Sequence, residues 1–155
     1  MLKIISGGQT GIDRMALEVA KELGIETGGY TPKGYLTENG LDLTLKEFGL
    51  EEIETIDYIH RTKCNIRSAS GSILFGNIES NGSKLLIRYS TVHFYPFIMN
   101  PTSERIVNYV NDLKQLTKDG SVILNIAGNR GSKISKEDLN KYREILKRAL
   151  IEVIK

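Results

Sequence analysis

The segment Ser6-Gly7-Gly8-Gln9-Thr10-Gly11 stands between a short apolar run and a helical pattern, and this placement constrains the fold most strongly. The run Leu2 to Ile5 is too short for a surface helix, which predicts a buried strand. After the glycine loop, apolar residues recur at spacings of three and four until Gly24 ends the pattern. They are Ile12, Met15, Ala16, Val19, Ala20 and Leu23. The chain therefore begins with a predicted strand, a tight loop and a helix.

The rest of the chain continues to alternate between strand-like and helix-like segments. Further strands are predicted at Ile25 to Tyr30, Ser72 to Phe75, His93 to Met99 and Val122 to Ala127. Further helices are predicted at Tyr58 to Ser68, from Ser83, from Ser103 with Ile106, Val110, Leu113 and Leu116 in helical spacing, and from about Ser135. Pro96 places its strand near an edge of the sheet or interrupts it.

The stretch from Tyr35 to Glu54 shows no regular pattern beyond one helical turn, and its length makes it a candidate lid or binding loop. Alternation across the whole length predicts one Rossmann-like, doubly wound α/β domain over residues 1–155. Its sheet is expected to be mostly parallel, with about five strands flanked by helices. In such sheets ligands bind outside the carboxyl ends of the strands, so the loops after the first, third and fifth strands are expected to meet.

The charge and the cysteine content of the chain limit its possible partners and its cellular location. The formal charge is +2, and the 21 Lys and Arg residues are spread along the chain, which gives nucleic-acid binding no support. Cys64 is the single cysteine, so no intramolecular disulfide can form, as is usual in a reducing cytoplasm. No apolar stretch is long enough for a signal peptide or membrane span. We expect a cytoplasmic protein without membrane contact, and a homo-oligomer with a dimer as the default.

The glycine loop suits an anion. Three glycines allow a tight bend that turns several N–H groups toward one point, and the following helix adds the positive end of its dipole. The loop is neither the dinucleotide fingerprint Gly-x-Gly-x-x-Gly nor a P-loop. The alternative is a purely structural connection, with Thr10 as the helix N-cap and Asp13 completing a capping-box-like pair.

Asp13 and Arg14 lie side by side in the first predicted helical turn. Arg14 is suited to clamp a phosphate with two hydrogen bonds. Asp13 is suited to accept from a ribose hydroxyl or to act as a general base, which makes it the candidate catalytic residue. Either residue could instead be a solvated charge of the first turn.

Two further loops carry polar and basic groups. Asn81-Gly82-Ser83 supplies a turn, a hydroxyl and a helix start, suited to a second part of the ligand. The segment from Ala127 to Lys133 contains Arg130 and Ser132 and is suited to an anionic group, although a solvated basic loop is an equal alternative.

Metal and nucleophile sites gain little support from the sequence. His60 and Cys64 are four residues apart and share a helix face, but two ligands do not make a zinc site. The other histidine, His93, lies in a different predicted element. No metal site is therefore predicted, and nothing places a Ser-His-Asp or Cys-His set together.

Several blocks of the sequence resemble the molybdenum carrier (molybdenum-cofactor-carrier-like) family. They are Ser6 to Arg14, Gly28 to Gly34, Tyr58 with Arg61-Thr62 and Asn65-Ile66-Arg67, and Leu124 to Arg130 with Ser132. That family is regarded as a circularly permuted branch of a Rossmann-like superfamily that includes lysine-decarboxylase-like phosphoribohydrolases and DNA-processing proteins. The resemblance implies binding of the molybdenum cofactor (molybdopterin), a pterin with a phosphate, or of another nucleotide-like molecule as cargo.

The sequence departs from these relatives at two places. Ala69-Ser70-Gly71 stands where the family often has an acidic residue before the third strand. The phosphoribohydrolases carry Pro-Gly-Gly-x-Gly-Thr-x-x-Glu in the second glycine loop, and here Asn81-Gly82-Ser83 is followed by Lys84-Leu85-Leu86 without that glutamate. Hydrolysis by the relatives' route is therefore not expected.

The favoured hypothesis is a carrier or binding protein for a small phosphorylated ligand. The predicted binding residues are Gly7, Gly8, Gln9, Thr10, Gly11, Arg14, Lys33, Arg61, Asn81, Gly82, Ser83, Gly128, Arg130 and Ser132. The alternatives are an enzyme that cleaves or transfers a nucleotide-derived group, with Asp13 as base, and a nucleotide-sensing module that acts through partners. DNA binding is the weakest choice.

Overall fold

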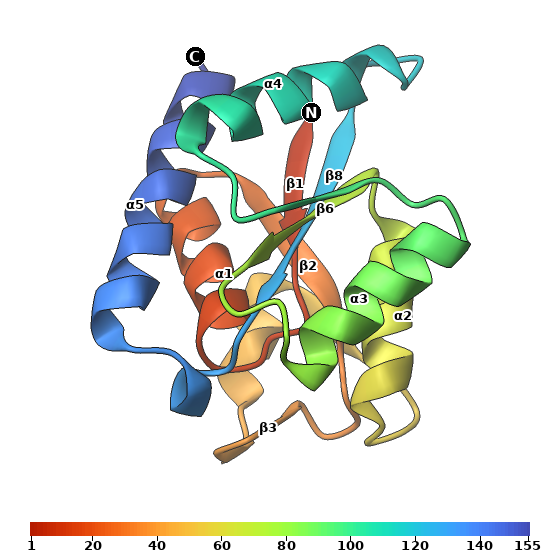
Figure 1. The fold of residues 1–155 in the computed structure, drawn as a ribbon. Coiled ribbons are helices and arrows are strands. Elements are labelled where there is room, and N and C mark those ends of the chain that lie inside the picture. Colours follow the sequence, from red (N-terminus) through yellow and green to blue (C-terminus); the bar gives the residue numbers. More distant parts are fainter.

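A six-stranded parallel sheet forms the centre of the protein (Figure 1), in a computed structural model that describes residues 1–155. The strands lie in the order β5-β2-β1-β8-β6-β7. Their bounds are β1 Leu2–Ile5, β2 Glu26–Thr31, β5 Leu50–Glu52, β6 Gly71–Phe75, β7 Phe97–Met99 and β8 Val122–Gly128. The predicted mostly parallel sheet is confirmed, with one strand more than expected.

Helices cover both faces of the sheet (Figure 1). On one side lie α1 Ile12–Glu22, α4 Ser103–Gln115 and α5 Lys136–Val153, which pack against one another. On the other side lie α2 Tyr58–Ser68 and α3 Asn81–Val92. This arrangement confirms the predicted doubly wound α/β fold.

Two apolar layers hold the helices on the sheet. The larger joins β1, β6 and β8 to α1, α4 and α5, and Ile4, Phe75 and Leu124 are completely buried in it. The smaller joins Leu74 to Ile66 of α2 and Leu86 of α3. Because parallel strands are covered on both faces, their sequences are continuous apolar runs, and β1, β6 and β8 could therefore be predicted from the sequence.

The segment from Tyr35 to Glu54, expected to be irregular, is the main correction to the predicted fold. It contains a separate hairpin of β3 Leu36–Thr37 and β4 Gly40–Leu41, the 3₁₀ helix η1 Leu43–Phe48, and β5. Leu45, Phe48 and Leu50 of this segment are buried against Leu17 of α1. Short elements with one or two apolar positions each give no period, so their packing emerges only in the folded chain.

Element ends also differ from the predictions. The predicted strand from His93 to Met99 is reduced to β7, because α3 continues to Val92 and Phe94 turns the chain with a φ of 60°. The edge position is confirmed, since β7 is the last strand in the sheet. The helix predicted from Ser83 begins at Asn81, because the hydroxyl of Ser80 accepts a hydrogen bond from the Ser83 N–H as an N-cap.

None of the helices combines the length and the apolar character that crossing a lipid bilayer requires.

Leu124 and Leu116 offer a matched test of the core. Leu124 is completely buried in β8, whereas Leu116, predicted to share the apolar face of α4, lies just after that helix and is 78% exposed. We expect Leu124→Ala to lower the free energy of unfolding by about 2–5 kcal/mol, because it leaves a cavity between sheet and helices. Leu116→Ala should change it by less than about 0.5 kcal/mol. Urea unfolding curves measure both, and equal effects would contradict the assigned core.

Candidate functional site

The loops after β1, β6 and β8 meet at the carboxyl ends of three adjacent strands and line one cavity of about 730 Å³. The predicted meeting of these loops is confirmed by the strand order, in which β8 lies between β1 and β6. Helix α2 forms a further wall, through Tyr58, Arg61, Thr62 and Asn65. A cavity of this size at this edge of a parallel sheet has the dimensions and the position of a small-molecule site.

The structure separates the predicted site residues into two groups. Those that line the cavity are Gly7, Gln9, Asp13, Arg61, Asn81, Gly82, Ser83, Gly128 and Arg130. Those that do not line it are Gly8, Thr10, Gly11, Arg14, Lys33 and Ser132. The lining residues that were not predicted include Asn125, Asn129 and Tyr58. For Tyr58 a signal existed, because residues 58, 61, 62 and 65 follow helical spacing and form one polar face of α2.

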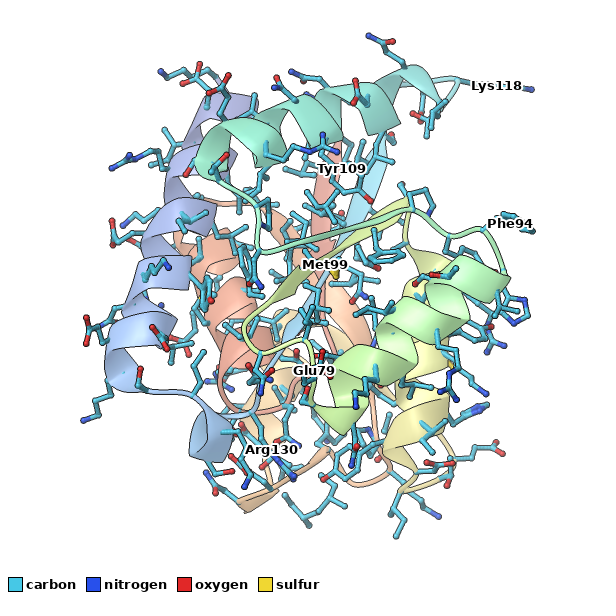
Figure 2. All side chains as sticks on the ribbon, in the orientation of Figure 1. Glu79, Phe94, Met99, Tyr109, Lys118 and Arg130 are labelled. Atoms are coloured by element: carbon cyan, nitrogen blue, oxygen red, sulfur yellow. The ribbon has the colours of Figure 1, made fainter.

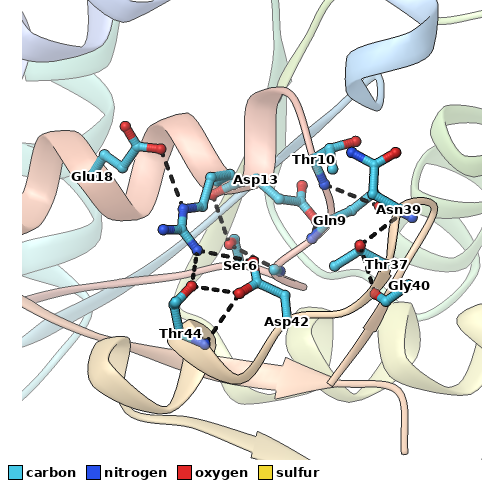
Figure 3. A network of polar contacts seen from close by, with 12 residues as sticks. Ser6, Gln9, Thr10, Asp13, Glu18, Thr37, Asn39, Gly40, Asp42 and Thr44 are labelled. Carbon is cyan, nitrogen blue, oxygen red and sulfur yellow. Dashed lines mark hydrogen bonds and ion pairs between the residues drawn. The ribbon is translucent and has the colours of Figure 1, made fainter. Parts of the chain in front are cut away.

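A buried ion pair lies beside the glycine loop at the cavity wall. Asp13 Oδ2 of α1 is 3.7 Å from Arg61 Nη1 of α2, and both side chains are about nine-tenths buried. The Gln9 N–H donates to Asp13 Oδ2 at 3.2 Å, and Arg61 Nη1 donates to the Gly7 carbonyl at 2.8 Å. The Ser6 hydroxyl donates to the Asp13 carbonyl (Figure 3). The pair therefore joins two helices on opposite faces of the sheet through the loop.

Burial controls the protonation of this pair. Removal from water raises the pKa of Asp13 to about 6, against the lowering effects of the Arg61 charge and of N–H groups of Gln9 and Gly7. Burial also lowers the pKa of Arg61, although the charge of Asp13 opposes this shift. Asp13 thus exchanges its proton close to neutral pH, and a group with this property suits proton transfer.

The glycines of the loop allow close packing. A Cβ at Gly7 would overlap the guanidinium of Arg61, and a Cβ at Gly11, where φ is +83°, would overlap the backbone oxygen of Asn129. A side chain at Gly7 would therefore displace Arg61 from its carbonyl acceptor.

Most N–H groups of the loop already have acceptors inside the protein. Gly8 N–H donates to the Ser6 hydroxyl, Gln9 N–H to Asp13, and Thr10 N–H to the Gln9 side chain. The loop thus surrounds its own carboxylate instead of presenting a free ring of donors. The N-cap alternative is wrong, since Gly11 is the N-cap of α1 and makes no side-chain capping bond. The Thr10 hydroxyl instead donates to Glu38.

Arg14 and Lys33 lie away from the cavity. Arg14 Nη1 donates to Asp42 at 3.1 Å and to Thr44 at 2.7 Å, and its Nε contacts Glu18 at 3.3 Å (Figure 3). These bonds fasten η1 to α1. Lys33 is exposed in the loop after β2. Neither residue is placed to bind a ligand in this cavity.

Donors that remain open to the cavity gather where α3 begins. The N–H groups of Asn81 and Gly82, in the first turn of this 12-residue helix, make no hydrogen bond within the protein. Arg130 and Lys133 line the same cavity from the loop after β8. Asn129 holds the two loops together, because its side chain accepts from Asn77 N–H at 2.6 Å and donates to the Asn77 carbonyl at 3.2 Å.

Potential metal ligands do not assemble. No group of three or more His, Cys, Asp or Glu side chains comes together, and neither His60 nor Cys64 lines the cavity.

The parallel sheet with a cavity outside its central strands defines a Rossmann-like α/β protein. The chain belongs to the circularly permuted YpsA SLOG family, whose model matches residues 4–150. It is also similar to a crystal structure of a "putative molybdenum carrier protein" from Syntrophus aciditrophicus SB, with 31% identity and a TM-score of 0.76. That similarity covers 99% of this chain and 94% of the other. No match is found among curated proteins.

The raised pKa of Asp13 predicts a pH dependence of stability. The pKa of Asp13 is about 6 in the folded protein, against an ordinary value of 3.8. The contribution of Asp13 protonation to the free energy of unfolding is therefore complete below pH 3.8 and is lost as pH rises through 6. We expect the stability of the wild type relative to Asp13→Asn to fall by about 3 kcal/mol between these limits. Urea unfolding over this pH range measures it. Asp119→Asn is the control, because hydrogen bonds from Ser121 lower the pKa of Asp119. The stability of the wild type relative to Asp119→Asn should therefore change with pH in the opposite direction. A stability difference between the wild type and Asp13→Asn that does not change with pH would contradict the raised pKa of Asp13.

Proposed function

We propose that this protein binds a small ligand, composed of a flat heteroaromatic ring and a phosphate, in the cavity between the three loops. The observation that carries the proposal is the cavity itself, which is lined by free helix N–H groups, by two cations, and by aromatic and apolar side chains. The proposed role is that of a carrier or binding protein. A single cavity of about 730 Å³ holds a ligand of the size of a mononucleotide.

The phosphate is placed at the start of α3. Asn81 and Gly82 offer N–H groups at the positive end of the helix dipole, and Ser83 lines the cavity beside them. Arg130 and Lys133 supply positive charge across the same space. The Arg130 side chain is half-exposed and therefore free to turn toward an incoming anion.

The ring is placed against α2 and the sheet. Tyr58 lines the cavity and contacts the guanidinium of Arg61 at 5.3 Å from its ring centroid. Leu74, Leu86 and Ala127 add an apolar surface. Asn125, which is buried in β8 and also lines the cavity, supplies an amide able to pair with a polar ring edge. Apolar walls with a few polar groups are typical of sites for heteroaromatic ligands.

The molybdenum cofactor is the leading candidate cargo, because the similar Syntrophus protein carries a molybdenum-carrier name and the cofactor combines a pterin with a phosphate. Cys64, the single cysteine, does not line the cavity and offers no thiolate to a metal there. We therefore infer recognition through the phosphate and the ring. A nucleotide satisfies the same chemistry and is the second candidate ligand.

An enzyme acting on a nucleotide-derived group is the second candidate function. The specific observation in its favour is Asp13, which lines the cavity and has a pKa of about 6. In this case Asp13 would transfer a proton to or from the bound ligand, while the neighbouring Arg61 stabilises its charged form.

We expect Arg130→Ala to weaken ligand binding about tenfold, because it removes a charge-assisted bond to the phosphate. Isothermal titration with molybdopterin, molybdate and nucleoside monophosphates measures the affinity. Lys118→Ala is the control, since it removes an equal charge at the opposite end of the molecule (Figure 2). The carrier proposal is contradicted if none of these compounds binds the wild type, and the phosphate placement is contradicted if both variants bind equally.

Turnover distinguishes the two functions. Nucleoside monophosphates incubated with the protein at high concentration are expected to remain intact when analysed by chromatography. If they are cleaved, and Asp13→Asn abolishes the cleavage while retaining affinity, the enzyme function replaces the carrier function.

A further inference from the structure

Glu38 is held in the manner of a bound anion. It occupies the turn of the β3–β4 hairpin, and its carboxylate accepts hydrogen bonds from the Thr10 hydroxyl, the Ser132 N–H at 2.9 Å and the Ser132 hydroxyl. Arg130 Nε lies 3.8 Å from the same carboxylate. We call these four residues the Glu38 cluster. The Glu38 side chain is only 14% exposed.

The partners of Glu38 are donors suited to any oxyanion. One cation, two hydroxyls and one N–H converge on the carboxylate, from the loops after β1 and β8. The Gly131 N–H supports this geometry by donating to the Thr10 hydroxyl oxygen at 2.9 Å, which leaves the Thr10 hydrogen for Glu38. Hydrogen bonds from Ser132 and Thr10, with the charge of Arg130, hold the pKa of Glu38 below its ordinary value.

The hairpin that carries Glu38 lies outside the main sheet. Its two strands pair only with each other, and Leu41 is 69% exposed. The Glu38 N–H also donates to the Gln9 side chain at 2.9 Å, so the turn is fastened to the glycine loop by polar contacts. At its base, Gly34 and Tyr35 both have positive φ, a conformation that marks a sharp local bend.

Arg130 connects the Glu38 cluster to the cavity. It lines the cavity and at the same time contacts Glu38, so one guanidinium faces two competing anions once a phosphorylated ligand enters. Ser132 does not line the cavity, and its donors are covered by Glu38.

We propose that Thr10, Arg130 and Ser132 form a second oxyanion site, separate from the phosphate position at the start of α3, that Glu38 occupies here, and that a further phosphate or other oxyanion displaces Glu38 and releases the β3–β4 hairpin. The carboxylate is thus an internal competitor that ties two of the three cavity loops together. The inference rests on the proposed function for the identity of the displacing ligand. The oxyanion site itself is tested with inorganic phosphate.

The experiment is a phosphate titration of the ¹⁵N-labelled full chain followed by NMR. The Ser132 amide reports on the Glu38 cluster, and the Asn81 and Gly82 amides report on the cavity. We expect Glu38→Gln to bind phosphate at Ser132 about tenfold more tightly than the wild type, because the competing charge is removed. Glu38→Asp retains the charge but is one methylene shorter, and it should give an intermediate affinity. Glu54→Gln controls for net charge on an exposed residue.

Hydrogen exchange of the wild type gives a second measurement that needs no substitution. Saturating phosphate is expected to accelerate exchange of the Glu38 amide, because release of the hairpin breaks its bond to Gln9. Equal phosphate affinity at Ser132 in wild type and Glu38→Gln, or no response of Ser132 in either, would overturn the inference. A Ser132 response together with silent Asn81 and Gly82 amides, in titrations with a nucleoside monophosphate, would retain the oxyanion site and contradict the proposed function.

Discussion

The buried contact between Asp13 and Arg61 is the constraint on which the site depends. It joins α1 to α2 across the edge of the sheet, and the loop between β1 and α1 is folded around it, with Gln9 donating to Asp13 and Gly7 accepting from Arg61. A buried charge pair needs hydrogen bonds to offset the loss of water, and here the backbone supplies them. The glycine loop is therefore shaped by an internal anion.

The cavity depends on a second set of polar contacts between loops. Asn129 ties the loop after β8 to the loop after β6, while the Glu38 cluster ties it to the loop after β1. Side-chain bonds of this kind fix the distance between segments that are far apart in the sequence. Asn81, Gly82 and Lys133 line the space between these loops, and the N–H groups of Asn81 and Gly82 make no hydrogen bond within the protein.

The carboxylates near the cavity differ in their burial. The chain belongs to the circularly permuted YpsA SLOG family, and the loop before α3 carries one glutamate, Glu79. Glu79 in that loop is exposed and pairs with Lys84 at 3.5 Å. Asp13 is the carboxylate that remains buried at the cavity, and its environment, more than its position in the sequence, gives it a pKa near neutrality.

The sequence by itself determined the order of the long elements and the edge of the sheet where the loops meet. Apolar runs and helical spacing report directly on burial, so β1, α1, β6, β8 and α5 were predictable. Only the tertiary structure decided the sixth strand, the contacts of Glu38 and the separation of Arg14 from the cavity. Leu50–Glu52 is too short to show a period, and the direction of a charged side chain is set by partners such as Asp42, 28 residues away from Arg14. Hydrogen bonds and ion pairs between residues far apart in the sequence leave no local sequence pattern, because they depend on which loops the sheet brings together.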